Sequence, residues 1–334
     1  MYIFTIAALI LLAWSGRKYY RMVFSENVTK NAVLYIYPTF NFNQVDSLLL
    51  SRQLIQDDKS FRFTAKLMKY PGHIKAGKYT ISEGMSSRAL LSLLRSGRQT
   101  PVRLVINKKH TLSELADYLA PQFSFSRDEI MNSLSDSAQI ADLGFTSETL
   151  IAMFIPNTYE LWWSSTPEAL LHRMKKEYDR YWTSERLSLA KKQQLNAVEV
   201  IVLASIVDEE TSKIDEKPVI AGLYINRLRR GIPLQSDPTL KFAYQHFEWK
   251  RIYNRYKKIV SPYNTYLFKG LPPGPICIPQ LSSIEAVLHA ADHDYIFMCA
   301  KEDFSGYHNF AKTNAEHERN RQKYIRALNE RGIR

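Results

Sequence analysis

A run of almost wholly aliphatic residues that ends in three consecutive acids constrains the fold of this chain more than any other segment. The run covers Ala197–Val207, and only Glu199 and Ser205 within it are not aliphatic. Such a run predicts a helix that is buried on nearly every side. Residues 208–210, with the sequence Asp-Glu-Glu, follow directly and therefore stand at the carboxyl end of that helix.

A carboxyl group at this end of a buried helix has two reasons to keep its proton. Burial disfavours the charged form, and the negative end of the helix dipole disfavours it further. A carboxylic acid that is still protonated near neutral pH can act as the general acid in glycosidic bond cleavage. The three acids could equally mark the point where a core helix reaches solvent. On these residues alone both interpretations stay open.

The net charge predicts an anionic partner without identifying it. The chain carries a formal charge of +12 and has a pI near 9.5, which favours attraction to nucleic acid, anionic lipid headgroups or anionic cell-wall polymers. Lys and Arg are dispersed, with local clusters such as residues 250–258. No zinc-finger spacing and no aromatic RNA-binding run is present, so we expect no nucleic-acid partner.

Cysteine and histidine usage indicates no metal site. Cys277 and Cys299 are too few for a zinc site, and no His lies at ligand spacing from them. Both thiols sit in apolar neighbourhoods, which favours buried free cysteines. A single disulfide in an oxidising compartment stays open as the alternative.

The amino terminus predicts an uncleaved membrane anchor over residues 1–24. Residues 1–14 are almost wholly apolar, but a full membrane crossing needs about 20 residues. Reaching that length means including Arg17 and Lys18, whose side chains could snorkel to the interface. A signal peptide would need a basic first region and a clear cleavage site, and both are missing. The basic cluster after the run would lie in the cytoplasm by the positive-inside rule, so charge does not decide the orientation.

The remaining sequence predicts an α+β fold in two parts. Residues 30–106 contain the strand-like segments Val33–Tyr37 and Gly77–Ile81, with short amphipathic helices at 44–56 and 86–95. Together they predict a small α+β subdomain, with a strand at 102–106 leading out of it.

The second part, residues 107–334, begins at a linker-like boundary near 107–109. It predicts a larger mixed α+β domain rich in helices, among them a long basic helix over Pro167–Leu195. After the acid-tipped helix come loop-rich segments, a short strand at 295–299 and a charged helix at 313–330.

Six motifs then occur in order across residues 150–320, and together they resemble the endolytic murein transglycosylase (YceG-like) family. They are Leu203–Thr211, Tyr224–Leu228, Leu234–Thr239, Tyr263–Tyr266, Gly270–Gly274 and His308–Phe310. The resemblance implies a single-pass protein of the bacterial cytoplasmic membrane. It also implies a LysM-like subdomain at 30–106 and a catalytic domain at 107–334 on the external side.

The resemblance assigns the catalytic acid to Glu210, which directly precedes Thr211 in the motif. Periodicity agrees, because Glu210 continues the apolar stripe of Leu203, Ile206 and Val207. Asp208 is a departure from the pattern, since the family usually has Glu at that position.

A lytic transglycosylase needs only this one carboxyl group. It cleaves the MurNAc–GlcNAc bond within peptidoglycan strands and leaves 1,6-anhydro-MurNAc ends, so we expect no metal and no cofactor. Polar groups must hold the bent sugar ring. The candidates for substrate binding are Gln235, Ser236, Asp237, Tyr263, Asn264, Tyr266 and, more weakly, Tyr159. The Tyr159 loop has Asn157 where the family tends to have Asp.

Two other functions remain open at this point. One is a muramidase-type hydrolase on the same scaffold, with Asp208 or Asp237 positioning water. The other is a non-catalytic envelope scaffold that holds glycan through the LysM-like subdomain. The expected partners are peptidoglycan strands, the membrane and cell-wall synthesis proteins, and the expected role is to limit nascent strand elongation.

Overall fold

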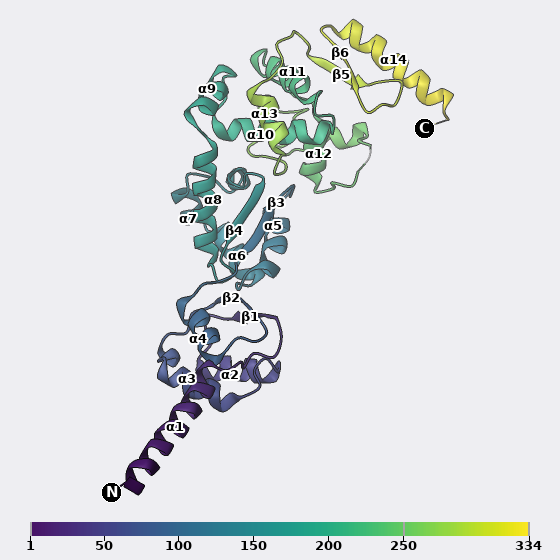
Figure 1. Cartoon of the computed structure of the whole chain (residues 1–334). Helices are drawn as coiled ribbons and strands as arrows, with labels where there is room; N and C mark the ends of the chain where they lie inside the picture. The colour runs from purple at the N-terminus through teal and green to yellow at the C-terminus, as the bar shows by residue number, and fades with distance from the viewer. Residues whose placement is uncertain (1, 250, 333–334) are drawn as a thin grey trace. The chain divides into compact units, whose positions relative to one another are not determined.

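The computed structural model describes residues 2–249 and 251–332 (Figure 1), and the chain forms two compact units. Unit 1 runs from the amino terminus to Leu104 and includes Ala120–Ser126 and Tyr159–Thr166. Unit 2 comprises Val105–Leu119, Arg127–Thr158 and the chain from Pro167 onward. The chain therefore returns to unit 1 twice after first leaving it, which the contiguous ranges 30–106 and 107–334 do not anticipate.

Unit 1 contains a two-stranded antiparallel sheet with helices packed on it. Its elements are α1 (Tyr2–Phe24), β1 (Ala32–Ile36), α2 (Phe42–Ser51), α3 (Asp58–Leu67), the 3-10 turn η1 (Tyr70–Gly72), β2 (Gly77–Ile81) and α4 (Ser87–Ser96). Leu34 of β1 pairs with Tyr79 of β2, and both side chains are buried in the core. Asn41, Asp57 and Ser86 accept hydrogen bonds from the first turns of α2, α3 and α4. Helix α2 ends before the predicted residue 56, because Gln53 adopts a left-handed backbone with φ of 52°.

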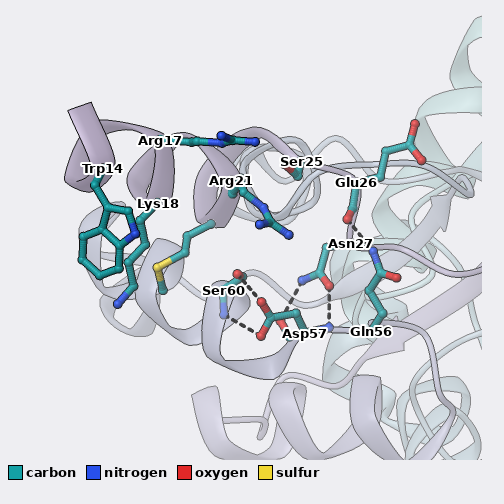
Figure 2. A pocket seen from close by; sticks show the side chains of 11 residues that line it. Trp14, Arg17, Lys18, Arg21, Ser25, Glu26, Asn27, Gln56, Asp57 and Ser60 are labelled. Carbon is teal, nitrogen blue, oxygen red and sulfur yellow. Dashed lines mark hydrogen bonds between the residues drawn. The ribbon is translucent and has the colours of Figure 1, made fainter. Parts of the chain in front are cut away.

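Helix α1 carries exposed apolar side chains along its first half and basic ones along its second. Within residues 2–249 and 251–332, no helix combines the length and hydropathy that a membrane crossing requires, so the predicted anchor over 1–24 is not confirmed. Arg17, Lys18 and Arg21 lower the hydropathy of α1. These three residues line a pocket of about 740 Å³, with Asp57 among the residues across from them (Figure 2).

Unit 2 begins with short elements and a pair of basic helices. Strands β3 (Val102–Ile106) and β4 (Asn157–Leu161), both of which straddle the boundary of the units, form a second two-stranded sheet. Between them in the sequence lie α5 (Leu112–Leu119), α6 (Arg127–Ser135), α7 (Ser137–Asp142) and η3 (Leu150–Met153), whereas η2 (Ala120–Gln122) belongs to unit 1. The predicted single helix over Pro167–Leu195 is wrong, because α8 (Pro167–Tyr181) ends before α9 (Ser184–Lys192) begins. Thr183 is extended and caps α9 by accepting a hydrogen bond from the backbone N–H of Arg186.

The buried helix α10 (Ala197–Glu210) lies at the centre of unit 2. Its residues 200–208 are all buried, and it packs against α11 (Lys217–Arg229) and α13 (Leu281–Leu288) (Figure 1). The other elements are α12 (Asp237–Tyr244), the 3-10 turn η4 (Asn254–Lys258), the antiparallel strands β5 (Phe297–Ala300) and β6 (His308–Ala311), and α14 (Asn314–Glu330). Asn196 and Glu199 form a capping box at the start of α10, so the helix begins one residue after Asn196.

Candidate active site

Glu210 is the last residue of α10, and its side chain lines a pocket of about 510 Å³ in unit 2. Thr211 is extended, with φ of −147° and ψ of 142°, which ends the helix at the pocket wall. The wall is built from α10, α11, α12, β5, β6, α14 and the loops beside them. Its polar and charged residues are Glu210, Tyr224, Arg227, Gln235, Asp237, Lys257, Tyr266, His308, Asn314 and His317.

Two hydroxyl groups hold one oxygen of the Glu210 carboxyl group. Tyr224 of α11 donates to Oε1 at 2.5 Å, and Ser236, just before α12, donates to the same atom at 2.5 Å. From the residues that the structure describes, no hydrogen bond reaches the other oxygen, Oε2. One oxygen is therefore fixed and the other is available to a ligand in the pocket.

This environment favours the protonated form of Glu210. Burial raises its pKa above the ordinary value, and the nearby charge of Asp237 raises it further. The hydrogen bonds from Ser236 and Tyr224 and the charge of His308 act in the opposite direction, but burial outweighs them. Burial also raises the pKa of Tyr224 well above its usual value, so its hydroxyl stays protonated and keeps donating.

The two preceding acids lie in a different environment, in which cationic side chains contact them. Asp208 contacts Nζ of Lys217 at 3.0 Å and Nζ of Lys108 at 2.8 Å, and Ser283 donates to it at 2.6 Å. Burial alone would raise the pKa of Asp208, but the hydrogen bonds from Lys108 and Ser283 lower it below the ordinary range. Asp208 is therefore an ionised structural carboxylate.

Glu209 is ionised for the same reason. Burial opposes its charge, but contacts with His110 at 3.5 Å and Lys108 at 2.8 Å outweigh that effect and lower its pKa to about 2. Of the three consecutive acids, only Glu210 has a raised pKa.

One group of potential metal ligands lies beside the pocket's helix. Asp208, Glu209 and Cys277 offer atoms within 4.8 Å of one another. Nζ of Lys108 lies 2.8 Å from each carboxylate, so an ammonium group already supplies the positive charge there. We interpret this group as an ion-pair cluster. Cys277 and Cys299 are both free thiols.

The structure gathers four of the predicted substrate-binding residues around Glu210. Gln235, Asp237 and Tyr266 line the pocket, and Tyr266 donates to Oδ1 of Asp237 at 2.6 Å. Ser236 is buried and contacts Glu210 itself rather than the open pocket.

The other three predicted binding residues are not on this wall. Asn264 is 0% exposed and donates to the carbonyls of Lys257 and Ile259, so it fixes the loop before it. Tyr263 packs on Phe242 with ring centroids 4.5 Å apart. Tyr159 is buried and belongs to unit 1.

Several residues that reach the pocket were not among the predicted catalytic or substrate-binding residues. Tyr224 and Arg227 lie in a motif that marked the resemblance, and the 14-residue interval from Glu210 to Tyr224 alone does not indicate contact. His308 is held by Glu216, which accepts from its backbone N–H at 2.7 Å and contacts Nδ1 at 2.9 Å. Lys257 belongs to the basic cluster at residues 250–258, which the sequence indicated only as a local concentration of positive charge.

Comparison with known proteins gives consistent matches. The model of the YceG-like family matches residues 34–323. A Bacillus subtilis (strain 168) protein named endolytic murein transglycosylase is 29% identical over 303 residues, which cover 86% of this chain and 83% of that protein. A Streptococcus pneumoniae (strain D39) protein of the same name is 28% identical over 316 residues, and the match covers 85% of this chain but only 57% of that longer protein.

A solved structure also resembles this chain. It is the crystal structure of a putative YceG-like protein from Listeria monocytogenes, with a TM-score of 0.57 and 25% sequence identity. The match covers 87% of this chain and 98% of the Listeria chain.

Proposed function

This chain belongs to the YceG-like family, and we propose that it is an endolytic lytic transglycosylase that cleaves MurNAc–GlcNAc bonds within peptidoglycan strands. The relatives named endolytic murein transglycosylase support the reaction class. The observation that carries the proposal is Glu210, which alone among the acids 208–210 has a raised pKa and which lies at the wall of an open pocket.

The reaction needs Glu210 as acid and then as base. Tyr224 and Ser236 hold Oε1, so the proton sits on Oε2 and passes to the glycosidic oxygen as its bond to C1 of MurNAc breaks. Glu210, now a carboxylate, accepts the proton of the C6 hydroxyl as O6 attacks C1. The products are a free GlcNAc 4-hydroxyl and a 1,6-anhydro-MurNAc end. Glu210 regains its proton and no water is consumed.

Asp237 is suited to stabilise the positive charge that develops at C1. Its carboxylate lines the same pocket as Glu210, and the Tyr266 hydroxyl fixes one of its oxygens at 2.6 Å. A negative group held in place before the reaction stabilises an oxocarbenium-like transition state without reorganisation. Gln235, whose Oε1 accepts from Arg227 at 2.6 Å, completes this side of the wall.

Asp237 is also the observation that favours the second candidate, a muramidase-type hydrolase. A second carboxylate in the pocket could activate water instead of leaving the C6 hydroxyl to attack. Asp208 does not suit that role, because it is buried and paired with Lys108 and Lys217. The mass of the product distinguishes the two reactions, since an anhydro end lacks one water relative to a reducing end.

The site of action that fits this reaction is the external face of the cytoplasmic membrane. The exposed apolar side chains of α1, such as Phe4, Leu9 and Leu12, would hold the chain there. Unit 1 would act as a LysM-like glycan-holding module, and cleavage beside cell-wall synthesis proteins would limit strand elongation. Protease treatment of intact cells tests this placement: degradation of unit 2 from outside supports it, and protection until lysis would contradict it.

Incubation of purified peptidoglycan strands with the chain tests the reaction. We expect internal cleavage with 1,6-anhydro ends, detected by mass spectrometry. Glu210→Gln should slow cleavage by a factor of ~10²–10⁴, the usual contribution of a general acid. Glu209→Gln is the matched control, since it removes a neighbouring carboxylate outside the pocket and should slow cleavage far less. Undiminished cleavage by Glu210→Gln would overturn the assignment, and reducing ends would favour the hydrolase.

A further inference from the structure

A positively charged loop adjoins the pocket and has no role in the proposed reaction. The loop, residues 251–258, includes η4 and carries Arg251, Arg255, Lys257 and Lys258, with no acid among residues 250–260. Within the part of the chain that the structure describes, none of these four side chains forms an ion pair with a carboxylate. The nearby acid Glu248 already contacts Nδ1 of His246 at 2.9 Å. The positive charge of the loop is therefore not neutralised by these carboxylates and can attract an anionic ligand.

Aromatic rings, rather than acids, hold these cations in position. The guanidinium of Arg255 lies 4.8 Å from the ring of Tyr256 and donates to its hydroxyl at 2.8 Å. Tyr256 packs on Trp249 with ring centroids 4.4 Å apart, and Arg251 lies 5.5 Å from the ring of Tyr253. Cation–π contacts orient a guanidinium without neutralising it, so the full positive charge remains.

Lys257 connects this loop to the catalytic pocket. It lines the pocket with Glu210, and its Nζ lies 4.5 Å from the ring of Tyr266, which donates to Asp237. The buried Asn264 fixes the backbone of Lys257, because its Nδ2 donates to that carbonyl at 3.0 Å. An anion that meets Lys257 must therefore belong to the saccharide at Glu210 or to a substituent close to it.

We propose that residues 251–258 form a subsite for the carboxylates of the stem peptides that peptidoglycan carries on its muramic acid. This inference rests on the proposed function and specifies its substrate as peptide-bearing glycan. GlcNAc and the MurNAc ring are uncharged, whereas the stem peptide carries several carboxylates a short distance from the scissile bond. Lys257 meets the carboxylate closest to the sugar, and Arg255 and Lys258 meet those further along the peptide.

Three substrates that differ in charge test this subsite. The first is peptidoglycan freed of phosphate-containing wall polymers, with its stem peptides intact. The second is the same material after its carboxylates have been converted to methylamides, which keeps the size and removes the charge. The third is glycan from which the peptides have been cleaved, which retains only the lactyl carboxylate on muramic acid.

We expect the full chain to cleave the first substrate roughly 3- to 10-fold faster than the other two at low salt, with the ratio falling as salt rises. In the double variant Arg255→Gln/Lys258→Gln the ratio should fall towards one. Both side chains are exposed, so folding should be unaffected. The control Lys191→Gln/Lys192→Gln removes the same charge from exposed positions on α9 and should keep the wild-type ratio.

Equal rates on the first two substrates would overturn the subsite while leaving the transglycosylase function intact. Cleavage of the third substrate as fast as the first would also overturn it, because the lactyl carboxylate that remains after peptide removal would then be the group recognised. If no substrate is cleaved, the proposed function fails. The subsite is then tested by a binding measurement instead. Calorimetry of Glu210→Gln with a soluble muropeptide and its methylamide should give tighter binding of the charged form. Equal affinity would contradict the proposal.

Discussion

The Ser236 hydroxyl lies 2.5 Å from Oε1 of Glu210, although 26 residues separate them in the chain. Ser236 directly precedes α12, so the start of that helix determines where the hydroxyl meets the acid. The bond lowers the pKa of Glu210, whereas burial raises it. Ser236 therefore affects both the orientation of the acid and the pH range in which the acid keeps its proton.

Ser236→Ala should shift the high-pH limb of the activity profile upwards. Glu210 must be protonated to act, so activity falls as pH rises through its pKa. Removing a hydrogen bond that lowers this pKa moves the fall to higher pH. The maximal rate should drop about tenfold, because a carboxyl group held by one hydroxyl is less well oriented. The measurement is kcat as a function of pH.

Ser283→Ala is the matched control for that experiment. It also removes a serine hydroxyl that donates to an acid of α10, but the acid is Asp208. Its pH limb should stay at the wild-type position. A limb that moves equally in both variants would show that the shift reports general loosening of α10 rather than the bond to Glu210.

Glu210→Gln should make the folded chain more stable at alkaline pH. Burial raises the folded-state pKa of Glu210, so the folded protein binds this proton more tightly than the unfolded chain and is favoured at low pH. That stability is lost as pH rises through the folded-state pKa. Glutamine has no proton to lose, and its amide oxygen can still accept from Tyr224 and Ser236. The gain at pH 8 should fall within the ~0.5–2 kcal/mol typical of single stabilising changes.

Urea unfolding of both proteins at pH 8 and pH 4 measures this difference. The gain should become much smaller at pH 4, where the wild-type carboxyl group is mostly protonated in both the folded and the unfolded state. A gain that is the same at both pH values would show that charge at Glu210 is not its source.

The sequence predicted the parts of this site that depend on local pattern. The aliphatic run predicts α10, and the family motif that ends at Thr211 is the basis for choosing Glu210 among the three acids. Local pattern does not report which distant groups reach that acid. Tyr224 and Ser236 meet Glu210 only because α11 and the start of α12 are both placed against the end of α10.

The same limit explains two other differences between expectation and structure. Lys108 lies in a segment that resembled a linker, yet its ammonium group contacts both Asp208 and Glu209. It precedes Glu209 by 101 residues in the sequence. The sequence did not indicate the helix break at Thr183, between α8 and α9, because the basic pattern continues on both sides of it. Thr is a weak signal within a helical pattern and becomes decisive only when its hydroxyl caps the next helix.

Lys217→Met should destabilise the chain by about 3–5 kcal/mol, the usual result of breaking a buried ion pair. The side chains of Lys217 and Asp208 are each 1% exposed, and the substitution leaves Asp208 with the Lys108 ammonium group and the Ser283 hydroxyl. The double variant Lys217→Met/Asp208→Asn should recover part of the loss, because no buried charge is then left without its partner. Urea unfolding free energies at pH 7 measure both effects.

The surface pair Lys175–Asp179 supplies the comparison for that experiment. Its Nζ–Oδ2 distance of 2.7 Å is shorter than that of the buried pair, but both groups reach solvent. Lys175→Met should therefore cost less than about 1 kcal/mol. Equal losses of unfolding free energy in Lys217→Met and Lys175→Met would show that burial does not determine how much the Lys217–Asp208 pair stabilises the chain.

Gly274→Ala should destabilise unit 2 because the loop leaves no room for a side chain. A Cβ atom at Gly274 would lie 1.9 Å from the carbonyl oxygen of Glu148 and 3.2 Å from the Tyr263 hydroxyl. The carbonyl belongs to the backbone and cannot rotate away, so the loop must move and unfolding should become easier by about 1–3 kcal/mol. Gly72→Ala is the matched control, since nothing lies within 4 Å of its Cβ position. The shift in the urea midpoint should therefore appear at Gly274 alone, and a comparable shift at Gly72 would point to chain flexibility rather than to the contact with Glu148.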